Sequence, residues 1–423
     1  MIIELRIKNC FSFSEQVVFS MKADMRSKRF ASNLININQQ NILKVAGIYG
    51  PNNAGKTCLI KCIRSLKNIL LGKNPQLMSN LFTKSHICEL GVTFSQNNCF
   101  YSYDIKYDAA ESIFIYEEFS ELTYDQYGNE KKNIWLLRGP EEQTVISESL
   151  ELNDILSAVS KNNLICYQVD VAKFEQLALI KQTIIEFAEK IEIVNMNNIP
   201  MRKTIDLLKN HNDLQTKVVN FVKNADIYME DFAYVDADRI NIEARMTEFG
   251  PDEKVLDIPE NVMDRIRLVS VYKGVPVPSL LFDSTGTKKI AALASYVVEG
   301  LENGKILVID ELDNSIHFKL TRAIVAMFNN ELNTNTQLIF TVHDINLMDC
   351  KRMFRKEQIW FIHKDFKQVY LYPLSEFTAE QGVRETTDVI EKYKKGVLGA
   401  LPEPELINTL LNIKGNPRIE EDE

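Results

Sequence analysis

The stretch Gly50-Pro-Asn-Asn-Ala-Gly55-Lys56-Thr57 decides how this sequence is interpreted. It matches the pattern G-x-x-x-x-G-K-[ST] and lies between an apolar run at 43–49, typical of a buried parallel strand, and a helical segment at 58–70. Its glycines let the backbone curl so that successive N–H groups and the start of the helix face an anion. We therefore expect a phosphate site, in which Lys56 reaches the terminal phosphates and the Thr57 hydroxyl is a Mg²⁺ ligand. The residues expected to contact the phosphates are Asn52, Asn53, Ala54, Gly55, Lys56 and Thr57.

A second candidate half of this site lies far downstream. The apolar segment 306–309 predicts a strand, and it ends in two carboxylates, Asp310 and Glu311. In phosphoryl-transfer sites the first acid of such a pair holds Mg²⁺ and the second polarises water. The spacing between Lys56 and Asp310 is too long for a compact Ras-like domain. It is natural if a sheet and a helical insert separate the two motifs.

The rest of the chain predicts an α/β protein in which a helical insert divides an α/β core. Residues 1–50 read as strands, because Ile3, Leu5 and Ile7 alternate with charged residues. Residues 89–137 are rich in Tyr, Phe, Ile and Thr in short segments, which predicts an antiparallel sheet attached to the first strands.

A helical periodicity follows from about Ser149 onward and ends before strand and helix signals alternate again at 267–361. It is carried by Ile180, Ile184, Phe187 and Ile191, which repeat at three to four residues, and by a second candidate helix at 214–222. The expected parts are residues 1–160 for the first part of the core, 161–267 for a mainly helical insert, and 268–423 for the second part of the core.

Composition narrows the class of protein. With 45% hydrophobic residues among 423, the chain can bury a large core, and its apolar runs are far shorter than the ~20 residues that cross a bilayer. Seven cysteines without a C-x-x-C pair indicate reduced thiols, so we expect a cytoplasmic protein without membrane partners. The net charge of −9 gives no support for nucleic-acid binding, although a local basic groove formed on dimerisation would not show in this sum.

Three further motifs make the sequence resemble the ABC-type ATPases of the SMC, RecF and OLD branch. The segment 282–289 contains Ser284 and Gly286 at the expected start of a helix and resembles the ABC signature of that branch. Asp313 follows Glu311 like the D-loop residue of the family, and His343 ends the next apolar strand like its switch histidine. The opening segment 8–13 also resembles the branch, whereas no glutamine can be assigned to its Gln-loop.

The resemblance implies an ABC-ATPase head, with a P-loop core in a mixed sheet, an antiparallel β subdomain and a helical insert. It implies ATP and Mg²⁺ as ligands, with Thr57 and Asp310 holding the metal and Glu311 and His343 acting in catalysis. In the family, Ser284 and Gly286 approach the nucleotide held by a second subunit, together with the D-loop Asp313. A homodimer or higher oligomer is therefore expected.

The ending 393–402 resembles that of standalone RloA- and AbiL-like ATPases, which, like the PARIS type, are linked to phage defence and act with a separately encoded effector. Too few residues follow Asp344 for a Toprim domain, so we expect no nuclease on this chain. The separately encoded effector would then be a nuclease or a Toprim-like protein. Two alternatives remain open at this stage. One is a RecF-like DNA-repair ATPase that binds duplex DNA. The other is a scaffold that binds ATP without turnover, which the Asp310–Glu311 pair disfavours.

Overall fold

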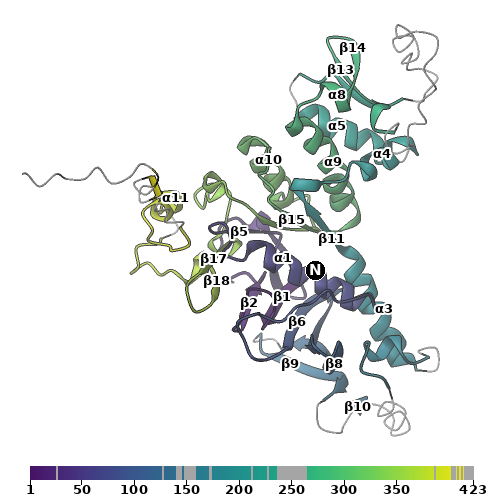
Figure 1. Ribbon diagram of the computed structural model, residues 1–423, viewed down its shortest axis with the longest axis vertical. Coiled ribbons are helices and arrows are strands. Elements are labelled where there is room, and N and C mark those ends of the chain that lie inside the picture. Colours follow the sequence, from purple (N-terminus) through teal and green to yellow (C-terminus); the bar gives the residue numbers. More distant parts are fainter. Residues whose placement is uncertain are drawn as a thin grey trace, which may run out of the picture.

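The fold is an elongated α/β arrangement with an antiparallel sheet at one end, a central mixed sheet, and a helical part with a small sheet at the other end (Figure 1). This confirms the expected fold class. The computed structural model describes residues 1–24, 27–125, 128–139, 145–146, 159–170, 174–210, 213–225, 228–235, 264–384 and 387–401, with 406, 409, 410 and 413. Within these ranges, every helix is too short or too polar to span a bilayer.

The central sheet has six strands in the order β11-β15-β16-β5-β17-β18. The first five run parallel and the last is antiparallel to its neighbour. All residues of β5, β15 and β16 are buried, as expected for parallel strands covered on both faces. The carboxyl ends of the parallel strands therefore share one edge. The strands are β5 (Val45–Tyr49), β11 (Ile191–Asn195), β15 (Ile306–Asp310), β16 (Gln337–Thr341), β17 (Ile359–Lys364) and β18 (Val369–Pro373).

Helices cover both faces of this sheet. On one face α1 lies between the central sheet and the antiparallel sheet, and its apolar side chains join the core that includes Ile48, Val308 and Ile339. On the other face α9, α10 and α11 contribute to a second core around Leu307 and Phe340. The two cores hold the central sheet rigidly in place. The helices are α1 (Lys56–Leu70), α9 (Thr285–Asn303), α10 (Phe318–Asn329) and α11 (Val389–Lys394).

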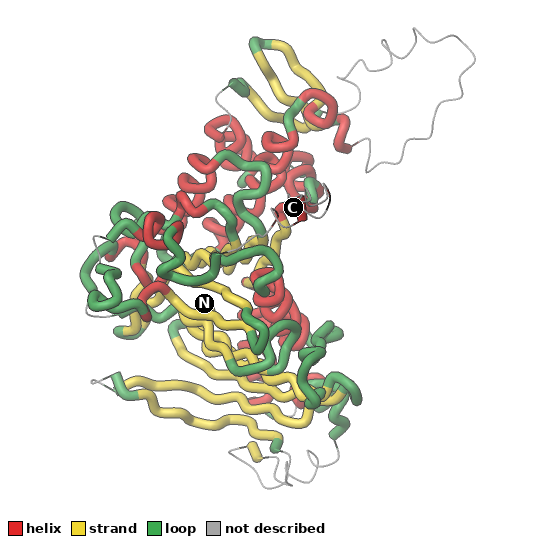
Figure 2. The backbone as a smooth tube through the Cα atoms, turned by 60° about the vertical axis from the view of Figure 1, so that its left-hand side comes forward, coloured by secondary structure: helices red, strands yellow, loops and turns green. Residues whose placement is uncertain are grey.

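The expected antiparallel subdomain is present as a seven-stranded sheet in the order β10-β9-β8-β7-β6-β1-β2 (Figure 2). Phe94 of this sheet stacks on Phe187 of α3 (Glu175–Lys190), with ring centroids 4.1 Å apart. The strands are β1 (Ile2–Lys8), β2 (Val17–Ser20), β6 (Ile87–Gln96), β7 (Cys99–Asp108), β8 (Ile113–Tyr124), β9 (Glu130–Arg138) and β10 (Val145–Ile146). A separate hairpin is formed by β3 (Leu34–Ile37) and β4 (Gln40–Leu43).

The range 161–267 contains helices, as expected, but also strands. The prediction of a helix at 214–222 is confirmed by α5 (Gln215–Ala225). The helical assignment of Ile191 is wrong, because α3 ends at Lys190 and Ile191 begins β11, which pairs with β15 of the central sheet. In the stretch from Ser149 to 267, residues 149–158, 171–173, 211, 212, 226, 227 and 236–263 lie outside the described residues. The remaining elements here are α4 (Arg202–Lys209), β12 (Asp231–Tyr234), β13 (Leu268–Tyr272), β14 (Val275–Pro278) and α8 (Ser279–Phe282).

A buried glutamine ties the antiparallel sheet to the central sheet. Gln337 is the first residue of β16 and is fully buried. Its side chain accepts a hydrogen bond from the N–H of Ile2 at 2.7 Å and donates to the carbonyls of Ile2 at 2.9 Å and Leu43 at 3.1 Å. Three backbone groups from the first strands thus find their partners in one side chain of the strand beside β5.

We expect Gln337→Leu to lower the free energy of unfolding by roughly 2–4 kcal/mol, because it leaves these buried backbone groups without partners. Denaturant titration of the purified variant measures the loss. Gln16→Leu, at an exposed position before β2, is the control and should change stability by less than about 0.5 kcal/mol. Equal stability of the two variants would contradict a structural role for the Gln337 amide.

Candidate functional site

The loop 50–55 between β5 and α1 has the backbone conformation that a phosphate-binding loop needs. Asn53, Gly55 and Gly50 all have positive φ, with values of 63°, 119° and 155°. A Cβ atom at Gly50 would lie 2.2 Å from the carbonyl oxygen of Ile362, so only glycine fits beside β17. A Cβ atom at Gly55 would come within 2.8 Å of Ser12 Oγ. The loop is therefore held between β17 and the segment that follows β1.

Lys56 is the first residue of α1 and directly follows this loop. It is buried, and its Nζ donates to the carbonyl oxygens of Gly50 at 2.6 Å and Pro51 at 3.1 Å. Thr57 is the next residue of the helix, and the first N–H groups of a helix have no partner within it. The loop thus presents backbone donors, the positive end of a helix dipole and an ammonium group in one place.

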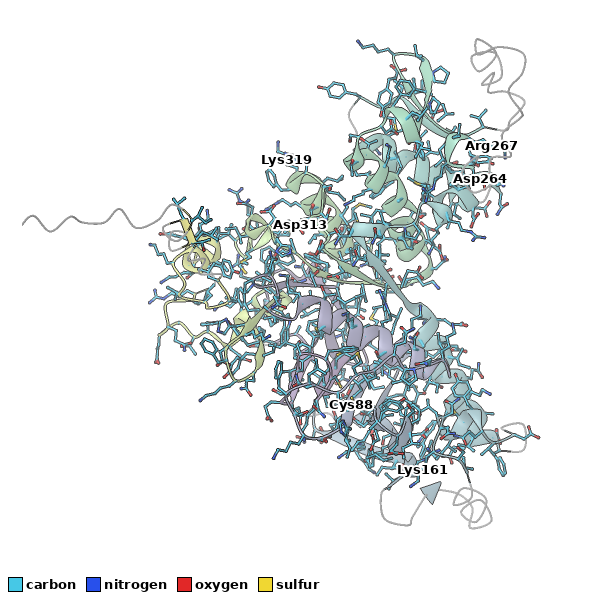
Figure 3. The ribbon with its side chains drawn as sticks, in the orientation of Figure 1. Cys88, Lys161, Asp264, Arg267, Asp313 and Lys319 are labelled. Atoms are coloured by element: carbon cyan, nitrogen blue, oxygen red, sulfur yellow. The ribbon has the colours of Figure 1, made fainter. Side chains whose placement is uncertain are left out.

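Burial lowers the pKa of Lys56, and the negative charges of Asp310, Asp313 and Glu311 act in the opposite direction. The three carboxylates come from the end of β15 and the turn after it, more than 250 positions along the chain. Asp313 is labelled in Figure 3, in the middle of the molecule. The structure therefore brings the phosphate loop and the predicted acidic motif into electrostatic contact.

Asp310 and Glu311 are fixed by a threonine of the neighbouring strand. Asp310, only 3% exposed, accepts a hydrogen bond from Thr341 Oγ1 at 2.7 Å, and its other oxygen accepts one from Asn195 Nδ2 at 3.3 Å. The N–H of Glu311 donates to the same Thr341 hydroxyl at 2.7 Å. Glu311 has a φ of 57°, the left-handed conformation that turns the chain sharply after β15. The two carboxylates have different partners, Thr341 and Asn195 for Asp310, and Asn197 and Asn314 for Glu311.

Asp313 connects this turn to the end of β16. Its Oδ2 accepts the backbone N–H groups of His343 at 2.9 Å and Asp344 at 2.8 Å, whereas its buried Oδ1 has no hydrogen-bond partner among the described residues. The His343 side chain is exposed at the same edge of the sheet. Asp313 and His343 therefore lie beside the acids, as their order in the sequence suggests.

Ser284 and Gly286 begin α9 and lie against the turn that follows Glu311. Ser284 is the N-cap of α9, because its Oγ accepts the N–H of Thr287 at 3.1 Å. A Cβ atom at Gly286 would be 2.8 Å from the carbonyl oxygen of Ser315, so glycine allows the close approach of helix and turn. The Ser284 side chain is exposed. The start of α9 is therefore accessible from outside the head.

Sequence reasoning missed three asparagines at this site. Asn195 contacts Asp310, and both Asn197 and Asn314 donate to the Glu311 carboxylate, at 2.8 and 2.9 Å. Asn195 and Asn197 could not be placed from the sequence, because the start of β11 has the apolar periodicity of a continued helix. Gln96, the last residue of β6, contacts Glu186 and Lys190 of α3.

We expect Thr341→Val to lower the free energy of unfolding by about 1–3 kcal/mol, because Asp310 and the N–H of Glu311 both lose a buried partner. The matched control is Thr321→Val, since the Thr321 hydroxyl is equally buried but has no hydrogen-bond partner among the described residues. The control should leave stability unchanged or slightly raised. If thermal and urea denaturation show the same effect for both variants, Thr341 has no special part in holding the acids.

Comparisons with known proteins give a family match and likenesses to solved structures, among them two SMC head structures. A family model described as "AAA domain, putative AbiEii toxin, Type IV TA system" matches residues 45–349, more than half of the chain. The SMC head domain from Thermotoga maritima is 13% identical, with a TM-score of 0.42 over 88% of this chain and 98% of that chain. An SmcHead bound to the C-winged helix domain of ScpA is 11% identical, with a TM-score of 0.43 over 90% of this chain and 99% of that chain. A search of curated proteins finds no match.

The matched region spans the phosphate loop, the acidic strand and the residues after β16, which are the elements that meet at the edge of the central sheet. The chain belongs to the AAA-domain family that this model describes.

Proposed function

We propose that the protein binds and hydrolyses ATP, and that two copies close around two nucleotides. The observation that carries the proposal is the meeting of the phosphate loop with Asp310 and Glu311 at one edge of the central sheet. There Lys56 is close enough to both acids for their charges to act on its pKa, against the larger effect of burial. Phosphoryl transfer needs a cationic side chain at the phosphates, an acid that binds the metal ion and a second acid that acts on water. Lys56, Asp310 and Glu311 would be these three groups.

The residues at this edge fit ATP and Mg²⁺. The backbone of Asn52, Asn53, Ala54 and Gly55 would surround the phosphates, and Lys56, which donates to two loop carbonyls in the structure, would donate to phosphate oxygens instead. The Thr57 hydroxyl and the Asp310 carboxylate would hold Mg²⁺, whose charge offsets that of the phosphates. The buried Asp313 Oδ1, for which the described residues offer no partner, is an acceptor that a hydrogen-bond donor of a bound ligand could satisfy.

Hydrolysis would use Glu311 as the general base. The water oxygen attacks the γ-phosphorus, the bond to the bridging β-phosphate oxygen breaks, and the water proton moves to the Glu311 carboxylate on its way to solvent. The products are ADP and phosphate. The exposed His343 lies at the same edge and would contact the γ-phosphate.

The second head would cover the nucleotide with the start of its α9. Ser284 and Gly286 lie at this helix N-terminus, which favours an anion. Directly before them, Leu281 and Phe282 are 71% and 65% exposed, an apolar pair beside the proposed contact. Exposed large apolar side chains next to one another lose their contact with water when a partner covers them. They therefore support dimerisation through this face.

Closure of the heads would control a separately encoded effector, such as a nuclease or a Toprim-like protein, in phage defence. The family description names a toxin of a type IV TA system, which supports action together with a second gene product. The part of the chain between β11 and α9 would transmit closure to the effector. Its helices α4 and α5 both pack on α9, whose first residues would contact the nucleotide of the other head.

We expect Glu311→Gln to trap an ATP-loaded dimer, because Gln keeps the shape of the side chain but cannot take the water proton. Mass photometry should show dimers with ATP and Mg²⁺, and the ATPase rate should fall by ~100-fold or more. Glu380→Gln, at an exposed position, should behave like the unmodified protein. Hydrolysis at the unmodified rate by the Glu311 variant would show that another group is the base.

The effector proposal is tested by purifying the protein from its native operon with the neighbouring genes present. A co-purifying small protein with a nuclease or Toprim-like sequence, beside an ATPase that ignores DNA, is the expected result. An ATPase that purifies alone and is stimulated by duplex DNA, with a steep salt dependence, would overturn the proposal in favour of a RecF-like repair ATPase.

A further inference from the structure

We propose that Asn197 and Asn314 are positioning residues that hold the Glu311 carboxylate with one oxygen anchored and the other presented to the attacking water. The inference rests on the proposed ATP hydrolysis and gives a role to two residues for which the sequence motifs predict none: Asn197 lies outside the motifs, and Asn314 follows the D-loop residue Asp313.

Both amides bind the same carboxylate oxygen. Asn197 Nδ2 donates to Glu311 Oε2 at 2.8 Å, and Asn314 Nδ2 donates to it at 2.9 Å. Asn314 Nδ2 also lies 2.5 Å from Asn197 Oδ1, so the three side chains form one closed group. In the described part of the chain no donor contacts Oε1. That oxygen keeps its lone pairs for a water proton.

The anchoring matters because a glutamate side chain has several rotatable bonds. An unanchored carboxylate samples many orientations, whereas a general base must lie within about 2.6–3.2 Å of the proton that it removes. Fixed donors on Oε2 restrict the torsions of Glu311 before the water is in place. The backbone of Glu311 is already fixed, by the Thr341 hydroxyl on its N–H and by the Asn314 N–H, which donates to its carbonyl oxygen at 2.9 Å.

The position of Asn197 follows from the pairing of β11 with β15. In this parallel register Asn195 lies opposite Asp310. The Asn195 side chain then accepts the N–H of Asn197 at 2.8 Å and starts a short 3₁₀ helix, η4 (Met196–Asn198). Met196 is fully buried in the core on the α9 face and fixes this turn. Asn197 is therefore held by a rigid element rather than by a loose loop.

The orientation of the Asn314 amide is set by a lysine on the opposite side. Lys289 Nζ of α9 donates to Asn314 Oδ1 at 2.5 Å, and Glu311 can only accept. A donor on one side and an acceptor on the other leave the amide a single arrangement, with Nδ2 toward Glu311. Lys289 also contacts Ser315 Oγ at 3.3 Å. The helix that begins with the signature residues thus supports the orientation of Glu311 within the same head.

The test is the steady-state kinetics of Asn197→Ala and Asn314→Ala in the full chain with ATP and Mg²⁺. A lost hydrogen bond to a charged group should lower kcat by roughly 10–100-fold. ATP affinity should be unchanged, because neither amide contacts the phosphate loop in the structure. The matched control is Asn198→Ala, which removes the exposed neighbouring amide and should keep the unmodified kcat.

A structural role is separated from positioning by repeating Asn197→Ala in the Glu311→Gln background. If Asn197 acts through Glu311, the second substitution should cause no further loss of the residual rate. An equal loss in both backgrounds, or an unmodified kcat for both single variants, overturns the inference even when Glu311→Gln alone abolishes turnover. A Glu311→Gln protein that hydrolyses ATP normally overturns the role of Glu311 as the base, and an unmodified protein that does not hydrolyse ATP overturns the proposed function, so these failures are distinguishable from that of the inference.

Discussion

The parallel alignment of β11, β15, β16 and β5 is the constraint on which the rest of the structure depends. Because these strands run in the same direction, the phosphate loop after β5, the acids after β15 and His343 after β16 emerge at one edge. β5, β15 and β16 are buried along their whole length, between the helices that cover both faces of the sheet. The geometry of the site is therefore fixed by the core and not by the loops that form it.

The partners of Lys56 indicate how a phosphate ligand would change the charge balance at this edge of the sheet. Lys56 lies in surroundings that disfavour its charge, and the nearest compensating charges are the carboxylates beyond the loop. In the structure its ammonium group uses the loop's own carbonyls as partners. Phosphate oxygens would be stronger acceptors for it, because both partners would then be ionised. Lys56 would therefore contribute more to the stability of the proposed nucleotide complex than to that of the protein alone.

The sequence predicts those parts of the site that are carried by short local patterns. The phosphate loop and the Asp310–Glu311 pair are visible because each follows an apolar strand and has a fixed spacing of residue types. The antiparallel sheet is visible because its strands have strong β propensity. The sequence does not predict β11, because its five residues continue the apolar periodicity of α3. They become extended only through pairing with β15, more than 100 positions away. Asn195 and Asn197 could not be placed for the same reason. The contacts of Asn314 with Glu311 and Lys289 could not be predicted either, because they depend on the packing of α9 against the turn.

The measurement that most directly tests the account is the ATPase rate of a mixture of two inactive variants. Lys56→Ala removes the phosphate-loop cation, and Ser284→Arg blocks the start of α9. If each nucleotide is held by Lys56 of one head and Ser284 of the other, a mixed dimer has one intact site, and the mixture should hydrolyse ATP well above the sum of the separate proteins. A mixture no more active than its two components, under conditions where mixed dimers form, would contradict the shared site.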